Sequence, residues 1–261
     1  MDWEKELYPV DEKPLDRLVE GYSNTAIFRT IGFIGDSLSS GEFETLDAEG
    51  NRHYHDLYEY SWGQYIARKN GLTAYNFSRG GMTAKEYIES FAETNKFWDN
   101  SKACQAYVMA LGVNDVINCG MEPGEISDID ADNYSNNKPT FLGNYAQIIS
   151  RYKEISPDAK FFLLTIPKGR PDEASERVDS ANKTVRALAE YFENTYIIDL
   201  NKYAPTYDDK FKEHFYLYGH MSPAGYIFTA KIVDSYIDYI IRHNPQDFKN
   251  VGFINTDIKY K

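Results

Sequence analysis

Five nearly continuous apolar runs of strand length limit the folds open to this chain more than any other feature of its sequence. A half-exposed strand alternates apolar and polar residues, whereas a continuous apolar run is typical of a strand buried on both faces of a parallel sheet. Such a sheet needs helices on each side. The runs lie at residues 30–35, 72–77, 104–111, 160–167 and 195–200.

Amphipathic helical patterns separate these runs. One ends at Gly71, a residue type that favours helix C-termini. Another begins at Thr83 with Glu86 three residues later, the spacing of a capping box, and the last begins with Ser222 followed by Pro223. The alternation predicts the α/β class, as a three-layer α/β/α sandwich with a mostly parallel sheet. The helical patterns cover residues 61–71, 83–98, 172–193 and 222–243.

We expect one domain, with a short segment at each end of the chain and one surface insertion. Its 261 residues with 42% hydrophobic content can bury one sizeable core. We expect an N-terminal arm over residues 1–25 and a single domain over 26–245. Residues 118–139, which are rich in Asn and Asp, are expected to form a surface insertion, and residues 246–261 a C-terminal tail.

The net charge and composition limit the classes of partner that the protein can bind. A net charge of −12 argues against a nucleic-acid partner and against docking on anionic lipid, and favours a neutral or cationic substrate. The expected partner is a small-molecule or carbohydrate ester. No apolar run reaches 18 residues, so we expect no membrane span. The first residues do not resemble a secretory leader, which predicts a cytoplasmic protein, or a secreted one if a leader was removed. The sequence leaves the oligomeric state open.

We expect no metal and no cofactor. Cys104 and Cys119 lack the close Cys or His neighbours of a zinc site, and Cys104 is expected to pack in the core. His53 and His55 could hold a metal if they lay on a strand, but no third ligand is near them in the sequence, so a polar surface loop is favoured.

Polar residues follow the predicted strands at the points where each strand ends. Asp36 and Ser37 follow the first run, Gly81 lies just after the second, Asn114 follows the third, and His220 precedes the last helical pattern. Ligands of such sheets bind outside the carboxyl ends of the strands, so these residues are expected on one rim. Each also has a plainer interpretation as a residue that shapes a turn or begins a helix.

Four motif blocks in order resemble the SGNH (GDSL) hydrolase family, and they span most of the chain. Each block is short and weak alone, whereas four in the right order and strand context are specific. The resemblance implies a flavodoxin-like five-stranded sheet and a hydrolase of esters. The blocks are GDSL at 35–38, NFSRGGMT at 76–83, GVND at 112–115 and HMSPAGY at 220–226.

The resemblance assigns Ser37 as the nucleophile and His220 as its general base. A serine hydroxyl needs a base to remove its proton, and the oxyanion that forms needs preorganised donors. The resemblance implies three donors: the backbone N–H groups of Ser37 and Gly81 and the side-chain amide of Asn114. Asp36 is expected to be structural, binding N–H groups of its own loop.

One position departs from the family pattern. The family usually carries an aspartate three residues before the catalytic histidine, and here that residue is Leu217. A displaced acid in the preceding segment is one alternative, and a main-chain carbonyl at Nδ1, also found in the family, is another. The third is an impaired enzyme or a binding protein. The candidate acids are Asp208, Asp209 and Glu213.

The leading hypothesis is a serine esterase that cleaves a carboxylic ester through an acyl-enzyme. Family substrates include acetylated sugars, lysophospholipids, thioesters and simple esters. The aromatic segment 41–60, taken as a loop beside the nucleophile, favours a carbohydrate O-acetylesterase, and the lack of a long apolar surface run disfavours long-chain lipids. The alternatives are a non-catalytic carbohydrate-binding module with the same fold, and a lysophospholipase or thioesterase of the family.

Overall fold

The computed structural model describes residues 2, 5, 9–169 and 172–258. Five strands form one parallel sheet in the order β4-β1-β5-β6-β7. This is the 2-1-3-4-5 order of the flavodoxin type, and it confirms the predicted α/β class and parallel sheet. The strands are β1 (Thr30–Gly35), β4 (Thr73–Ser78), β5 (Ala106–Ala110), β6 (Lys160–Leu164) and β7 (Thr195–Ile198).

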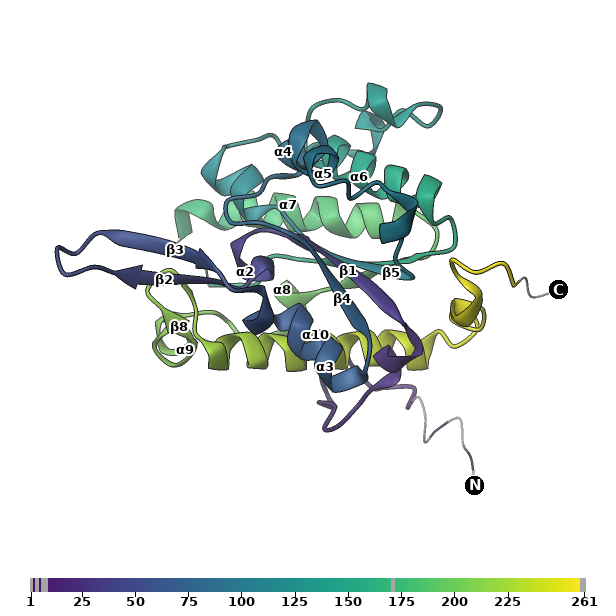
Figure 1. The fold of residues 1–261 in the computed structure, drawn as a ribbon, viewed down its shortest axis with the longest axis horizontal. Helices are drawn as coiled ribbons and strands as arrows, with labels where there is room; N and C mark the ends of the chain where they lie inside the picture. Colours follow the sequence, from purple (N-terminus) through teal and green to yellow (C-terminus); the bar gives the residue numbers. More distant parts are fainter. Residues whose placement is uncertain (1, 3–4, 6–8, 170–171, 259–261) are drawn as a thin grey trace.

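Helices cover both faces of the sheet and complete the three layers (Figure 1). Helices α3 (Trp62–Asn70) and α10 (Pro223–His243) pack on one face, and α6 (Phe141–Ile155) and α7 (Asp172–Tyr191) pack on the other. Each face therefore has its own apolar core. The sequence patterns identified α3, α7 and α10, whereas α6 was not singled out.

The predicted helix ends are present. Gly71 closes α3 with φ +67°, and the Ser222 side chain accepts from the Gly225 N–H at the start of α10. The Thr83 side chain likewise accepts from the Glu86 N–H. The helix after Thr83 is unbroken over residues 84–94 but is not α-helical throughout. It consists of α4 (Ala84–Glu86), a wider π turn (Tyr87–Phe91) and α5 (Ala92–Thr94).

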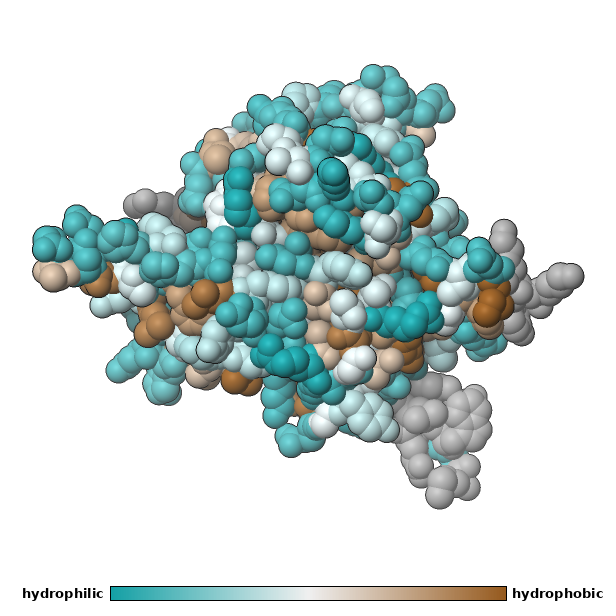
Figure 2. Space-filling model, in the orientation of Figure 1, coloured by the Kyte–Doolittle hydropathy of each residue, from teal (hydrophilic) through white to brown (hydrophobic). Residues whose placement is uncertain are grey.

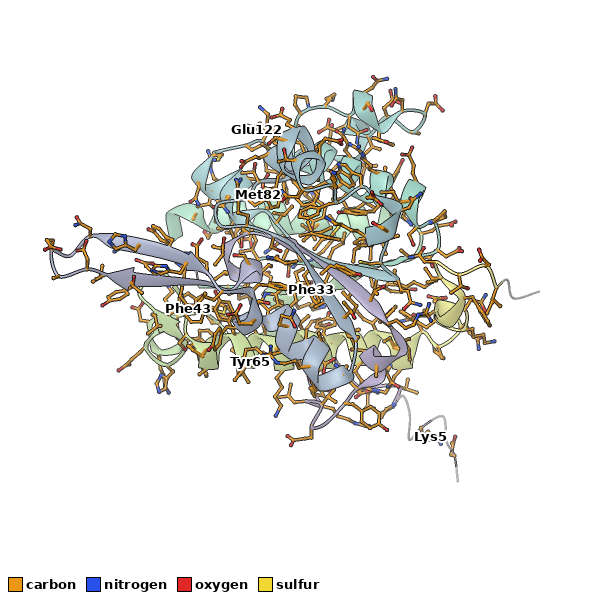
Figure 3. All side chains as sticks on the ribbon, in the orientation of Figure 1. Lys5, Phe33, Phe43, Tyr65, Met82 and Glu122 are labelled. Atoms are coloured by element: carbon orange, nitrogen blue, oxygen red, sulfur yellow. The ribbon has the colours of Figure 1, made fainter. Side chains whose placement is uncertain are left out.

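Residues 41–60 form mainly a β-hairpin rather than the expected aromatic loop. Strands β2 (Glu42–Leu46) and β3 (Arg52–Asp56) pair antiparallel and project from the body of the molecule (Figure 1). The projecting end is largely hydrophilic (Figure 2). Phe43 lies at the root of the hairpin (Figure 3). Its ring packs edge-on against those of Tyr60 and Tyr226.

Described residues near both chain ends pack with α10 in the apolar core on its side of the sheet. The Glu12 carboxylate pairs with Arg242 and His243 at the end of α10, at 2.7 and 2.9 Å. In the expected insertion, Asp128 accepts from Lys138 and Thr140, which ties the segment to the start of α6. Residues 1, 3–4 and 6–8 of the predicted arm and 259–261 of the predicted tail lie outside the described residues. Among the described helices, none has the length and apolarity to cross a membrane.

Candidate active site

Ser37 lies at the carboxyl end of β1, next to the switch point between β1 and β5 where sheets of this topology bind ligands. It is the first residue of the short helix α2 (Ser37–Ser40). The Asp36 side chain accepts from the Leu38 N–H at 3.1 Å and so caps this helix. Glycine is required at position 35, because a Cβ there would lie 2.2 Å from Ser39 Oγ. The tight turn thus presents Ser37 just above the sheet.

Asn114 and the glycine block lie together on the same rim. Asn114 belongs to a π turn (Val113–Asn118) that follows β5, and its Nδ2 donates to the Met82 carbonyl at 3.1 Å. Asn118 Nδ2 donates to Asn114 Oδ1 at 2.7 Å, which fixes the orientation of the Asn114 amide. Gly81 has φ +72°, a conformation that favours glycine.

The buried side chain of Asp115 joins the two rim segments. Its Oδ1 accepts from the Ala84 N–H at 2.8 Å, so the segment after β5 holds the segment after β4. Burial raises the pKa of Asp115 to about 7, although N–H donors that include Ala84 oppose the shift. This carboxyl is therefore partly protonated near neutral pH.

His220 lies between two glutamates of the projecting hairpin. It begins the two-residue strand β9 (His220–Met221), just before α10. Its Nδ1 lies 3.2 Å from Glu44 Oε2, and its Nε2 lies 3.0 Å from Glu42 Oε1. The two glutamates are separated by one residue on β2, so their side chains share a face of the strand.

Glu44 is held as an ionised group. Only 2% of the residue is exposed, and it accepts from the Gly219 N–H at 3.0 Å and pairs with Arg52 at 2.9 Å. Burial opposes its ionisation, but the bonds from His220 and Gly219 and the charge of Arg52 outweigh burial and lower the pKa of Glu44. An ionised carboxylate can only accept, so Nδ1 of His220 carries the proton.

The pKa of Glu42 is shifted in the opposite direction. Burial raises it, and the nearby carboxylates of Asp56 and Asp36 raise it further, while His220 acts against the shift. A Cβ at Gly80 would lie 2.0 Å from Glu42 Oε2, so the carboxyl group rests against the glycine block. Glu42 therefore lies between His220 and the glycines.

The acids expected from the sequence do not lie at His220. Asp208 caps helix α9 (Asp209–Phe215) by accepting from the Phe211 N–H, and Asp209 and Glu213 belong to that helix. In the part of the chain that the structure describes, none of the three bonds to His220, and a carboxylate rather than a main-chain carbonyl faces Nδ1. The sequence offered one sign of this arrangement, two glutamates at alternate positions shortly after Ser37.

A groove of about 710 Å³ brings most of the expected site residues together. Across the described residues no hydrogen bond links the Ser37 hydroxyl to His220, whose Nε2 contacts Glu42 instead. Tyr54 and Tyr218 lie at the groove and are 55% and 61% exposed. The lining residues include Ser37, Glu42, Tyr54, Gly80, Gly81, Asn114, Lys168, Lys212, Tyr218 and His220.

A smaller apolar cavity of about 70 Å³ adjoins the groove. Asp36, Leu38 and Val113 line both spaces, so the cavity lies beside Ser37. Its other walls come mainly from the core between the sheet and α10, including Trp62, Leu164 and Met221.

No metal centre is evident among these residues. His53 and His55 lie on strand β3 rather than in a loop, and each bonds within the hairpin, to Asp47 and Thr45 respectively. Within residues 2, 5, 9–169 and 172–258, no three His, Cys, Asp or Glu side chains are grouped as metal ligands would be.

The sheet order, the turn that carries Ser37 after β1 and the histidine before the last helix are those of the SGNH hydrolase fold, which belongs to the α/β class. Residues 33–227 match the GDSL-like lipase/acylhydrolase family, and the chain belongs to that family of ester-hydrolysing enzymes. No curated protein matches the sequence.

Several solved structures share the fold at low sequence identity. A family two carbohydrate esterase from Clostridium thermocellum, in complex with cellohexaose, is 16% identical with a TM-score of 0.58, covering 88% of this chain and 67% of that one. A carbohydrate acetylesterase from Sinorhizobium meliloti is 13% identical with a TM-score of 0.54, covering 81% and 99%. A putative lipolytic protein of the G-D-S-L family from Desulfitobacterium hafniense is 13% identical with a TM-score of 0.50, covering 80% and 99%.

Proposed function

We propose that this protein is a serine esterase that removes short acyl groups from carbohydrate esters. The observation that carries the proposal is the hydrogen bond between His220 Nδ1 and Glu44, in a groove that also contains Ser37 and Asn114. A carboxylate at Nδ1 fixes the tautomer with a basic Nε2 and stabilises the imidazolium that forms during catalysis. Glu44 thus takes the role of the aspartate that is missing at Leu217.

The reaction follows from these roles. Ser37 Oγ bonds to the acyl carbon while its proton passes to His220 Nε2, and the resulting oxyanion accepts from the N–H groups of Ser37 and Gly81 and from Asn114 Nδ2. The C–O bond to the alcohol then breaks, and the alcohol oxygen takes the proton from Nε2. A water molecule attacks the acyl-enzyme in the same way and releases the acid and Ser37.

Two features support a short acyl group on a carbohydrate. The cavity beside Ser37, about 70 Å³, has room for a few atoms but not for a twelve-carbon chain. The exposed rings of Tyr54 and Tyr218 at the groove give apolar faces with a polar tip, which suit a sugar ring. The low-identity carbohydrate esterases agree with this choice of substrate.

The rival hypothesis of a non-catalytic carbohydrate-binding module has lost its main argument. It rested on the missing aspartate, and Glu44 provides a carboxylate at the same ring nitrogen. A lysophospholipase or thioesterase of the family would need an apolar site for a longer acyl chain, and the apolar cavity beside Ser37 is too small for one.

Acetate release from acetylated xylose or glucose derivatives tests the proposal. Ser37→Ala should lower kcat by at least about 10⁴-fold, because the nucleophile and base act as a unit, while the melting temperature stays near that of the wild type. Ser101→Ala, on an exposed turn, is the matched control and should keep full activity. More than a few per cent of wild-type turnover in pure Ser37→Ala would refute the nucleophile.

A further inference from the structure

The Glu42 carboxyl contacts the ring nitrogen of His220 that has to act as the base. Its Oε1 lies 3.0 Å from Nε2, the atom that has to accept the proton of Ser37. With Glu44 accepting from Nδ1, a carboxyl oxygen 3.0 Å from Nε2 is favourable only where one of the two groups is protonated, as an imidazolium beside a carboxylate or as a neutral carboxyl beside the imidazole. In either case the Nε2 lone pair is not available to Ser37. Turnover therefore requires Glu42 to leave this position.

The backbone of Glu42 is fixed, so the movement is confined to its side chain. The Tyr226 hydroxyl donates to the Glu42 carbonyl at 2.6 Å, and the residue pairs with Asp56 across the hairpin. Phe43, the next residue, is packed between two aromatic rings. The carboxyl group, by contrast, lines the open groove and can change rotamer within it.

The charge of Glu42 matters for the same reason. Its Oε2 rests against Gly80, next to the expected oxyanion donor Gly81. An ionised carboxylate there would repel the developing oxyanion, and a buried carboxyl without a hydrogen-bond partner is unfavourable. Burial and the carboxylates of Asp56 and Asp36 raise the pKa of Glu42, which favours a neutral carboxyl when it leaves His220. A neutral carboxyl can both donate to and accept from a hydroxyl.

Building on the proposed function, we infer that Glu42 is a specificity-determining residue that recognises a free hydroxyl next to the scissile ester. The free hydroxyl of such a substrate forms a hydrogen bond with the Glu42 carboxyl, which then moves away from His220 Nε2. The proton between Glu42 and His220 stays on Glu42, so Nε2 is free to act as a base. A substrate without the hydroxyl leaves Glu42 on His220. The preferred substrates are therefore partly acylated sugars with a vicinal hydroxyl.

The test compares two acetylated methyl glucosides that differ only at the carbon next to the ester, one with a free hydroxyl and one with a methoxy group. The wild type should prefer the free hydroxyl by about 10- to 100-fold in kcat/KM, the range for a hydrogen bond to a charged or strongly polar buried group. In Glu42→Ala the preference should fall below about threefold, mainly because kcat for the methoxy substrate rises. Glu49→Gln, at the exposed hairpin tip, should keep the wild-type preference.

Each other outcome has a distinct meaning. Equal hydrolysis of both substrates by the wild type, or an unchanged preference in Glu42→Ala, would overturn the inference but leave the esterase intact. Loss of both activities in a folded Glu42→Ala, judged by its melting temperature, would also overturn it, since Glu42 would then be needed for every ester. If Glu42→Ala does not fold, Glu42→Leu, which fills a similar space but cannot bind a hydroxyl, is judged by the same criteria. Absence of Ser37-dependent release from either substrate would instead refute the proposed function.

Discussion

Two regions meet at His220, and they differ in how firmly the fold holds them. The rim of the sheet carries Ser37 and Asn114 directly after buried strands, and side-chain bonds from Asp115 and Asn118 hold its segments together. The β2–β3 hairpin projects from the body, and only Glu42, Phe43 and Glu44 of its strands are buried. The core fold thus carries the proposed nucleophile and oxyanion donors, whereas the projecting hairpin contacts the proposed base through Glu42 and Glu44. Changes in the hairpin can alter the histidine without disturbing the rim.

In the β2–β3 hairpin, we expect the largest loss of activity from a substitution of Glu44. Glu44→Gln removes the charge that orients His220 and stabilises its protonated form, and we expect kcat to fall by about 10³–10⁴ with little change in KM, as when a triad loses its acid. Steady-state kinetics on an acetylated sugar measure this effect. The melting temperature must be followed too, because Glu44 also binds Gly219 and Arg52.

Three matched controls lie in the segment before His220. Asp208→Asn, Asp209→Asn and Glu213→Gln should each keep activity within about tenfold, since Asp208 caps α9 and the other two lie in that helix. A thousandfold loss in one of them, or retention of more than a tenth of wild-type kcat in Glu44→Gln, would show that Glu44 is not the orienting acid.

On the rim of the sheet, we expect a substitution of Asn114 to cause a smaller loss of activity. Asn114→Ala removes one of three proposed oxyanion donors, so kcat should fall by about 10²–10³ while KM stays nearly constant. Asn136→Ala, on an exposed turn of the insertion, is a suitable control. If only KM changed in Asn114→Ala, the side chain would bind the ground state and not the oxyanion.

The rim is also expected to set the length of the acyl chain. Acetyl and butyryl esters of one alcohol should exceed the dodecanoyl ester by at least about tenfold in kcat/KM, because the cavity beside Ser37 is about 70 Å³ and additional methylenes find no apolar site there. A series of p-nitrophenyl esters measures the dependence. A maximum at twelve carbons would contradict the short-chain proposal and favour a lipid or thioester substrate.

The rim was predictable from the sequence, whereas the hairpin was not. Strands buried on both faces leave continuous apolar runs, and short motifs after them place Ser37 and Asn114 at strand ends. Along β2 the buried face that meets His220 carries carboxylates, so Glu42 and Glu44 look like exposed loop residues. Glu44 also lies 176 positions before His220. The alternate spacing of the two glutamates is the one local sign, and it cannot show the contact with His220, because that contact depends on where the folded hairpin packs.

The remaining predictions concern how the free energy of unfolding depends on pH, and the two regions are expected to contribute slopes of opposite sign. Asp115 of the rim has its pKa raised to about 7, so between about pH 4 and 7 the folded protein binds more protons than the unfolded chain. Its contribution therefore makes stability decrease as pH rises, by at most about 1.4 kcal/mol per pH unit. Asp115→Asn should remove this slope, and Asp132→Asn on an exposed turn should not.

Glu44 of the hairpin should give the opposite dependence. Its pKa is lowered in the folded state, so it stabilises the protein above its ordinary pKa of 4.5, and that stabilisation disappears as pH falls through the lower folded value. Relative to the wild type, Glu44→Gln should therefore be destabilised at neutral pH and become nearly equal in strong acid. Urea unfolding from pH 3 to 8 gives the free energy of unfolding of Asp115→Asn, Glu44→Gln and the wild type. Parallel pH profiles for the two variants would mean that the carboxyls of the rim and of the β2–β3 hairpin share one environment, contrary to the difference between the two regions.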